Sequence, residues 1–212
     1  MKAMDEPAVI GIVVYEGVEP IDVGGTIGVL SMARRILPAL RHVTIAEQAG
    51  PVRLASGLTI LADAGFADAP PCDVTVVTGG PGWRKQVDDP RMLAFLRERA
   101  PSQLASVCTG ALILAASGQL AGRTATTRRN AVGAETQAPL DLLAASVAAA
   151  PAAAVSDDHG IVTSGGVSLA IDGMLYILGR LYGDAARDRV AGIIEYDRAF
   201  AANRAALGHL VA

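Results

Sequence analysis

The segment LASVCTGA, residues 104–111, predicts a strand, a sharp turn and a helix in immediate succession. Cys108 stands directly after the apolar strand residues, and a helical pattern begins at Gly110. A nucleophile elbow has this order, and its tight turn needs small residues two positions before and two positions after the nucleophile. Ser106 and Gly110 meet that requirement. Cys108 is therefore the candidate nucleophile of a cysteine enzyme.

The position of Cys108 at the start of a helix predicts that its sulfur is ionised. Unpaired N–H groups and the helix dipole favour negative charge there, and the thiolate is the reactive form of cysteine. The N–H of Thr109, and that of Gly80 from a neighbouring glycine turn, would form an oxyanion-hole-like pair of donors. The alternative is a buried cysteine that only fills space, which is common for free cysteines. Cys72, which follows two prolines, is interpreted as structural.

Strands alternate with helices on both sides of this segment. The run AVIGIVVY at residues 8–15 is apolar throughout, as expected of a strand buried on both faces of a parallel sheet. A similar run at residues 73–77 leads directly into the glycine turn TGGPG, residues 78–82. These features predict a three-layer α/β/α domain with a doubly wound, mostly parallel sheet. Ligands bind such sheets at the carboxyl ends of the strands, where Cys108 and the glycine turn both fall.

The other elements are predicted from apolar spacing, prolines and turn residues. Further strands are expected over 41–48, 104–107 and 123–127, with one hairpin over 52–61 and an edge hairpin turning at 158–160. Helices are expected over 21–37, 88–99, 110–117, 168–181 and 184–195, followed by a tail that is helical or loosely docked. We expect one domain over 1–212, with its core at about 8–197 and the tail at 198–212.

Composition excludes several classes of protein. Hydrophobic residues make up 51% of the 212 residues, which is ample for a packed core, and the net charge of -3 offers no basic surface for nucleic acid. No apolar run reaches the roughly 20 residues of a membrane helix. The polar, acidic start of the chain does not resemble a secretory signal, so we expect a cytoplasmic protein. Two cysteines exclude a disulfide framework, and no Cys/His spacing predicts a metal site.

Asp22 is the candidate acid–base partner of the thiol, because it follows the first strand at the same end of the sheet as Cys108. The alternative role is capping of the following helix, which is common for Asp, and spacing alone does not separate the two. Glu19 is expected to face solvent. None of His42, His159 and His209 is placed to serve Cys108, so the sequence does not support a Cys–His hydrolase.

These motifs resemble the ThiJ/PfpI superfamily, which shares the flavodoxin-like fold of class I glutamine amidotransferases. The similarity runs from about residue 8 to about 197 and is nearest to the isocyanide (isonitrile) hydratase branch and to the sensory domains of AraC-type regulators. It is carried by five motifs in order: YEGVEPIDVGG at 15–25, VTGGPG at 77–82, VCTG at 107–110 with GRTATT at 122–127, IVTSGGVS at 161–168 with Ile171-Asp172, and Glu195-Tyr196-Asp197.

The resemblance implies a hydro-lyase that adds water to an isocyanide, without a metal or an organic cofactor. Cys108 would be the nucleophile, Asp22 the acid–base residue, and Thr109 a hydroxyl and N–H donor. The amides near Gly79 and Gly80 would bind the reacting atom or a water. The resemblance also implies a homodimer that takes a small-molecule substrate.

Trp83, the only tryptophan, follows the glycine turn and is assigned to the substrate pocket, with simple packing or a dimer contact as alternatives. Two positions depart from the family pattern: Thr26 stands where proline is usual, and Arg128-Arg129 stands where histidine and an aromatic residue are typical. The arginines put a cation near the pocket or, equally well, on the solvated surface. Two other functions remain open, a non-catalytic ligand-sensing domain and a glyoxalase- or deglycase-type cysteine enzyme.

Overall fold

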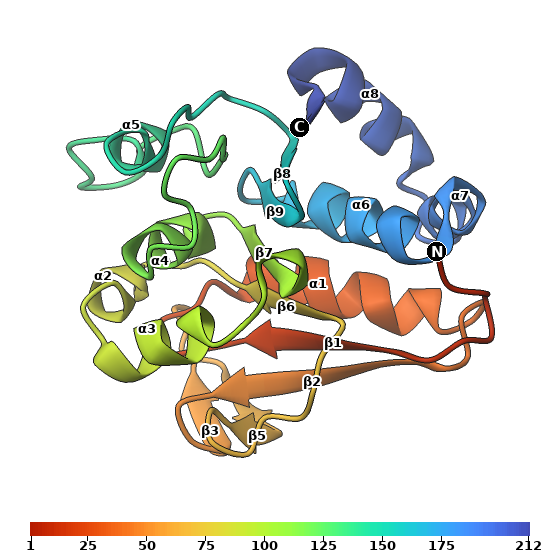
Figure 1. The fold of residues 1–212 in the computed structure, drawn as a ribbon, viewed down its shortest axis with the longest axis horizontal. Coiled ribbons are helices and arrows are strands. Elements are labelled where there is room, and N and C mark those ends of the chain that lie inside the picture. Colours follow the sequence, from red (N-terminus) through yellow and green to blue (C-terminus); the bar gives the residue numbers. More distant parts are fainter.

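The apolar strand β1 (Ala8–Val13) lies in the interior of an eight-stranded central sheet (Figure 1). The computed structural model describes residues 1–212. The other strands of this sheet are β2 (Leu40–Ala46), β5 (Ala64–Gly65), β6 (Val74–Val77), β7 (Leu104–Val107), β8 (Val155–Asp158), β9 (Ile161–Ser164) and β10 (His209–Val211). Their order is β10-β8-β9-β7-β6-β1-β2-β5, and only the β8–β9 pair is antiparallel. The predicted mostly parallel sheet is confirmed.

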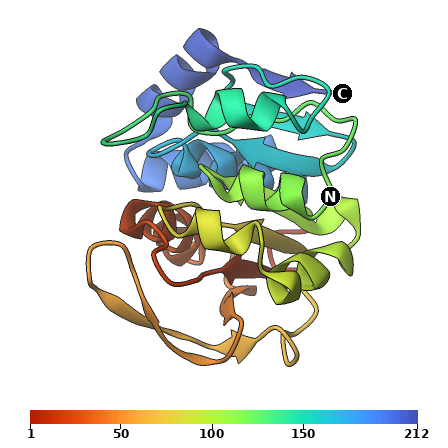
Figure 2. The same cartoon turned by 90° about the vertical axis from the view of Figure 1, so that its left-hand side faces the viewer.

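Helices cover both faces of the sheet and give the three predicted layers (Figure 2). On one side α1 (Pro20–Ala33), α6 (Ala170–Tyr182) and α7 (Asp184–Ile193) pack together, and on the other α2 (Trp83–Gln86) and α3 (Pro90–Arg97) pack against α4 (Gly110–Ala116). The remaining helices are the 3-10 turn η1 (Pro101–Gln103), α5 (Pro139–Ala144) beside α4, and α8 (Asp197–Leu207) beside α7. The layered α/β fold follows from strands too apolar to face water.

Two details differ from the sequence-based expectation, whereas the hairpin predicted over 52–61 is confirmed. Residues 123–127 form no strand, because Thr124 makes only an isolated bridge to Ala149. The β8–β9 hairpin is present but is not the edge of the sheet, since β10 pairs with β8 outside it. The predicted hairpin over 52–61 is formed by β3 (Gly50–Arg53) and β4 (Thr59–Ala62), which stand apart from the main sheet.

The carboxyl ends of the central strands meet at one place. In the parallel register Val13 of β1 pairs with Val77 of β6, and Val77 pairs with Ser106 of β7. On the other side of β7, Val107 pairs with Ser164 of β9. The segments that follow these strands therefore converge, and the glycine turn, Cys108 and the start of α1 become neighbours. No helix of the protein combines the length and the apolar character that crossing a membrane requires.

Candidate active site

Cys108 occupies the predicted elbow between β7 and α4. Its backbone has a positive φ of 52°, a conformation that non-glycine residues rarely adopt and that costs about 1–3 kcal/mol. The turn is tight because Gly110 lies against β6, where an added Cβ would collide with the carbonyl oxygen of Val77. The hydroxyl of Thr127 donates to the Cys108 carbonyl at 2.6 Å and helps to fix the strained residue. Backbone strain of this kind is typical of functional positions.

Asp22 lies in the first turn of α1 and is completely buried. Its carboxylate does not cap the helix, since the N-cap residue Glu19 makes no side-chain cap and Asp22 points away to the glycine turn. The N–H of Gly79 donates to Asp22 Oδ2 at 2.8 Å, whereas Asp22 Oδ1 is buried without a hydrogen-bond partner. The carboxyl group lies close enough to the Cys108 thiol for each group to shift the pKa of the other. The structure thus brings together the two side chains that sequence reasoning paired.

Burial dominates the protonation of this pair. It raises the pKa of Asp22 from 3.8 to about 7, although the Gly79 N–H and the neighbouring Cys108 thiol act in the opposite direction. Burial, followed by the nearby Asp22 charge, also raises the pKa of Cys108 from 9.0 to about 12, against the opposing Thr109 N–H. The predicted resting thiolate is therefore wrong. The start of a helix stabilises a negative charge by only about 0.3–1 kcal/mol, whereas burial can raise the pKa of a thiol by several units.

The pair nevertheless retains one proton over a wide range of pH. Two interacting groups titrate together, and the first proton leaves near pH 7 while the second leaves only near pH 12. Over that range Asp22 and Cys108 carry one negative charge and one proton between them. The pair can place the charge on sulfur when the proton moves to the carboxyl group, and the Thr109 N–H favours that charged sulfur.

Thr109, Gly79 and Gly80 form the frame around the pair. The N–H of Gly80 donates to Thr109 Oγ1 at 2.9 Å, so it is engaged within the frame and does not face the cavity as the predicted second donor. A Cβ on Gly79 would lie 2.5 Å from Thr109 N and 2.8 Å from Asp22 Oδ2. Gly80 has a φ of 136°, and a Cβ there would collide with the backbone of Glu19. Only glycine fits at both positions.

Cys108 is 3% exposed, yet it lines a cleft of about 690 Å³, a size that suits a small molecule. Trp83 lies in the wall of this cleft, nearly buried, and its indole N–H has no hydrogen-bond partner. Gly80 and Thr109 also reach the cleft, while Asp22 and Gly79 stand behind Cys108. Glu19, expected to face solvent, lines the cleft as well. The lining residues are Glu19, Ile21, Gly80, Pro81, Trp83, Arg84, Cys108, Thr109, Arg128, Val132, Ala134, Glu135 and Val167.

Sequence reasoning missed an ion pair in the cleft wall. The Arg128 side chain is only 10% exposed, and its Nη2 donates to both carboxylate oxygens of Glu135, at 2.7 and 2.8 Å. Arg84, which stacks on Trp83, lies 3.6 Å from the same carboxylate. Arg128 stood out as a departure from the family pattern. Glu135 lies in an irregular segment whose sequence carries no periodic signal.

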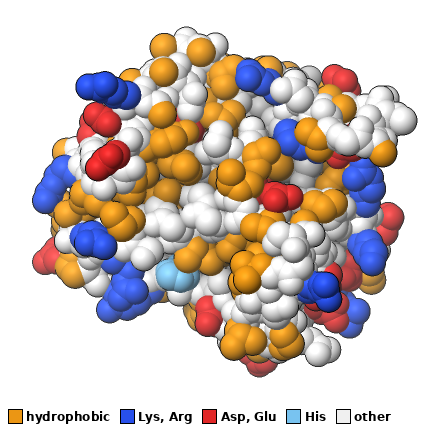
Figure 3. All heavy atoms as spheres, turned by 180° about the vertical axis from the view of Figure 1, so that it is seen from behind, with side chains coloured by type: hydrophobic (Ala, Val, Ile, Leu, Met, Phe, Trp, Pro, Cys, Tyr) orange, Lys and Arg blue, Asp and Glu red, His pale blue; other side chains and the backbone are white.

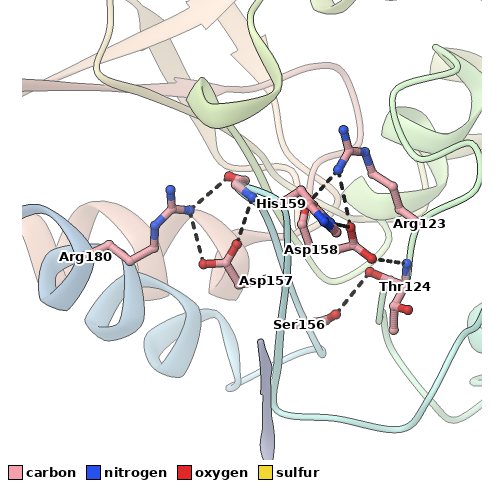
Figure 4. A network of polar contacts seen from close by, with 8 residues as sticks. Arg123, Thr124, Ser156, Asp157, Asp158, His159 and Arg180 are labelled. Carbon is pink, nitrogen blue, oxygen red and sulfur yellow. Dashed lines mark hydrogen bonds and ion pairs between the residues drawn. The ribbon is translucent and has the colours of Figure 1, made fainter. Parts of the chain in front are cut away.

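A second polar cluster surrounds the β8–β9 turn and is separate from the cleft (Figure 4). Asp158 accepts from the Thr124 N–H at 2.7 Å and pairs with Arg123 at 3.3 Å, while Asp157 pairs with Arg180 at 3.5 Å. His159 belongs to this cluster and its side chain is 73% exposed. The cluster ties the segment after α4 to the sheet. No group of three or more His, Cys, Asp and Glu side chains lies close enough to hold a metal ion.

Comparison with known proteins adds an independent line of evidence. Residues 8–179 match the DJ-1/PfpI family. An isonitrile hydratase from Pseudomonas putida is 31% identical over 189 residues, which cover 88% of this chain and 78% of the relative. The crystal structure of a ThiJ/PfpI family protein from Pseudomonas syringae is similar with a TM-score of 0.77 and 28% identity, over 91% of this chain and 76% of that one.

A regulator is also among the relatives. The HTH-type transcriptional regulator GbdR from Pseudomonas aeruginosa is 28% identical over 201 residues, or 91% of this chain. The matched part is 52% of GbdR, so the chain spans about half of that protein's length. Enzymes and regulators thus share this fold, and the residues of the cleft have to distinguish between them.

Proposed function

This chain belongs to the DJ-1/PfpI family, and from that premise we propose that it is an isocyanide hydratase, which adds water to an isocyanide and releases an N-substituted formamide. The observation that carries the proposal is the buried Cys108–Asp22 pair, which retains one proton between about pH 7 and pH 12 and whose sulfur lines a cleft. The isonitrile hydratase relative from Pseudomonas putida supports the choice of reaction.

The first half of the reaction uses the shared proton. The terminal carbon of an isocyanide is electrophilic, and the Cys108 sulfur attacks it after its proton has moved to Asp22. A C–S bond forms, and Asp22 returns the proton to the same carbon. The product is a thioimidate on Cys108, and all atoms of the thiol and of the isocyanide are retained in it. The Thr109 N–H stabilises the negative sulfur before the attack.

Water completes the reaction. The ionised Asp22 takes one proton from a water molecule, whose oxygen attacks the thioimidate carbon, and the substrate nitrogen receives that proton. The C–S bond then breaks, the hydroxyl oxygen becomes the formyl carbonyl as it loses its proton, and that proton returns to the sulfur–carboxyl pair. A group that both gives and takes a proton works best with a pKa near the operating pH, which the value of about 7 for Asp22 satisfies.

The direct test compares the purified protein with Cys108→Ala and Cys72→Ala, using cyclohexyl isocyanide and measuring the formamide by NMR. We expect turnover by the unchanged protein and by Cys72→Ala, and only the uncatalysed rate with Cys108→Ala. Intact-mass measurement after rapid acid quenching should detect an adduct on Cys108 equal in mass to one isocyanide. Normal turnover by a correctly folded Cys108→Ala protein would disprove the mechanism.

A ligand-sensing domain is the second candidate function. The GbdR relative favours it, and so does a thiol whose pKa is about 12, because such a thiol is unreactive unless its proton is removed. Calorimetric binding of an isocyanide without formation of formamide would support this function. A parallel incubation with methylglyoxal tests the third option, a cysteine enzyme acting on glyoxal-type carbonyls.

We also propose that the protein is a cytoplasmic homodimer, as the family resemblance implies. The face opposite to that of Figure 1 carries apolar side chains across its middle and most of its charges nearer the rim (Figure 3). Such a distribution is typical of protein–protein contacts. Light scattering should give about twice the 21.7 kDa mass of the chain. A mass of one chain at micromolar concentration would contradict the dimer.

A further inference from the structure

The cleft beside Cys108 already holds a carboxylate, which belongs to the protein itself. Glu135 receives both hydrogen bonds that Arg128 Nη2 gives, accepts the N–H of Val132 at 2.9 Å and lies 3.6 Å from the Arg84 guanidinium. Two guanidinium groups around one carboxylate form a geometry that is specific for planar anions. All of these groups belong to residues that line the same cleft as Cys108.

The stem of Arg128 packs beside the nucleophile. Its side chain is 10% exposed, and Gly166 separates its stem from the nucleophile, because a Cβ on Gly166 would lie 2.7 Å from Cys108 Sγ and 3.0 Å from Arg128 Cβ. The preceding Thr127 is hydrogen-bonded to the Cys108 carbonyl at 2.6 Å. The stem of Arg128 therefore lies beside the reacting sulfur, and its guanidinium lines the same cleft.

Glu135, in contrast, belongs to a surface segment. Residues 129–137 contain no helix or strand, and all of them except Glu135 are exposed. The polar contacts of this segment to the rest of the cleft centre on the Glu135 carboxylate and on the Asn130 carbonyl, which accepts from Arg128 Nη1. Removing Glu135 alone would leave a buried cation unpaired, which is costly, but exchanging it for another carboxylate keeps Arg128 paired.

We propose that Arg128 binds a carboxylate of the substrate, in the place that the Glu135 carboxylate takes in this structure. The proposal rests on the proposed function and deepens it, because it assigns the substrate class as small isocyanides that carry a carboxylate. Arg128 holds the acidic group, and the isocyanide carbon then lies toward Cys108. A neutral isocyanide does not displace Glu135 from Arg128, so it gains no binding energy from the Arg128 guanidinium.

Alkylation of Cys108 tests carboxylate recognition without relying on catalysis. Iodoacetate and iodoacetamide have nearly the same size and reactive carbon, but only iodoacetate carries a carboxylate. Their rates at Cys108 and Cys72 are measured by peptide mass spectrometry, with Cys72 as an internal reference outside the cleft. The ratio of the two rates cancels any change in thiol pKa, because that change affects both reagents equally.

We expect Arg128→Gln to lower the iodoacetate-to-iodoacetamide ratio at Cys108 about tenfold, the equivalent of about 1.4 kcal/mol. Glu135→Gln should raise the ratio about threefold or more, because the competing carboxylate is gone. The matched controls are Arg129→Gln and Asp141→Asn, which remove the same charges from exposed neighbouring positions and should leave the ratio unchanged. Arg128→Lys keeps the positive charge but loses the forked guanidinium, so its ratio should be intermediate. This variant replaces Arg128→Gln in the test if Arg128→Gln does not fold.

A ratio at Cys108 that is the same in the unchanged protein, Arg128→Gln and Glu135→Gln would overturn the proposal. Turnover of isocyanoacetate and of its methyl ester separates this inference from the proposed function. An Arg128-dependent alkylation ratio without turnover of either compound would retain the carboxylate site and reject the hydratase. Equal turnover of both compounds, unaffected by Arg128→Gln, would retain the hydratase and reject the carboxylate site.

Discussion

Replacement of Asp22 by Asn should make the protein more stable and less active, and the gain in stability should depend on pH. Asp22 is completely buried, and its pKa is raised from 3.8 to about 7 by that burial. The folded chain therefore binds this proton more tightly than the unfolded chain. Stability from this group is fully present below about pH 4 and is lost as the pH rises through about 7.

The structure gives the size of the effect. Each tenfold change in proton affinity is worth about 1.4 kcal/mol, so a carboxyl group that titrates near 7 in place of 3.8 costs the folded chain about 4 kcal/mol once it is ionised. Asn has nearly the same shape, and its oxygen can still accept the Gly79 N–H. Asp22→Asn should therefore raise the free energy of unfolding by about 2–4 kcal/mol at pH 8, and by under about 1 kcal/mol at pH 4.

Urea unfolding of the unchanged protein and of Asp22→Asn at pH 4, 7 and 8 measures this difference. Asp68→Asn is the matched control, because Asp68 is exposed and its side chain makes no hydrogen bond or ion pair, so its effect should stay within about 0.5 kcal/mol. Formamide production by Asp22→Asn should fall by about 10²–10⁴-fold. A variant that is less stable than the unchanged protein at pH 8, or equally affected at pH 4 and 8, would refute the reasoning about the buried carboxyl.

Three further outcomes follow from contacts in the structure. Gly79→Ala should destabilise the protein by about 1–3 kcal/mol and impair turnover, because the added Cβ would lie 2.5 Å from Thr109 N. Gly192→Ala is the control: its added Cβ meets nothing within 4 Å, so it should raise the free energy of unfolding in urea by about 0.5–1 kcal/mol. Asp158→Asn should lower the free energy of unfolding by about 1–3 kcal/mol at pH 7 and by less at pH 3. The Thr124 N–H lowers the pKa of Asp158, so the stability that the ionised carboxylate provides is lost as the pH falls below the usual pKa of an aspartate. A loss that does not depend on pH would contradict this. Iodoacetamide should modify Cys108 faster in Asp22→Asn than in the unchanged protein at pH 8.5, because the Asp22 charge helps to raise the pKa of Cys108, and an unchanged rate would show that burial acts alone.

Local patterns predicted the fold and the proximity of Cys108 and Asp22. The apolar run at residues 8–15 and the order of strand, Cys108 and helix are properties of neighbouring residues, and the structure contains both as β1 and the β7–α4 elbow. The placement of Asp22 beside Cys108 followed from the rule that the carboxyl ends of parallel strands meet. The resemblance to a known family suggested the proposed reaction, which no pattern of residues could supply.

Properties that depend on the completed packing were not predictable in the same way. The pKa of Cys108 depends on how deeply the sulfur is buried, and sequence shows only that a helix begins after it. The bond from the Gly80 N–H to Thr109 Oγ1 and the pairing of Arg128 with Glu135 both depend on the paths of irregular segments. Strand β10 contains three residues, too few for a periodic signal, and it forms because β8 offers it unpaired backbone groups.

The short strand β10 also affects the tendency of the protein to aggregate at high concentration. Unpaired backbone groups along a sheet margin can recruit strands from other chains and begin aggregation. Here one margin is β10, with three residues, and the other is β5, with two. Both ends of the sheet are too short to template the growth of a fibril, so we expect solutions that remain clear on concentration as long as the chain stays folded.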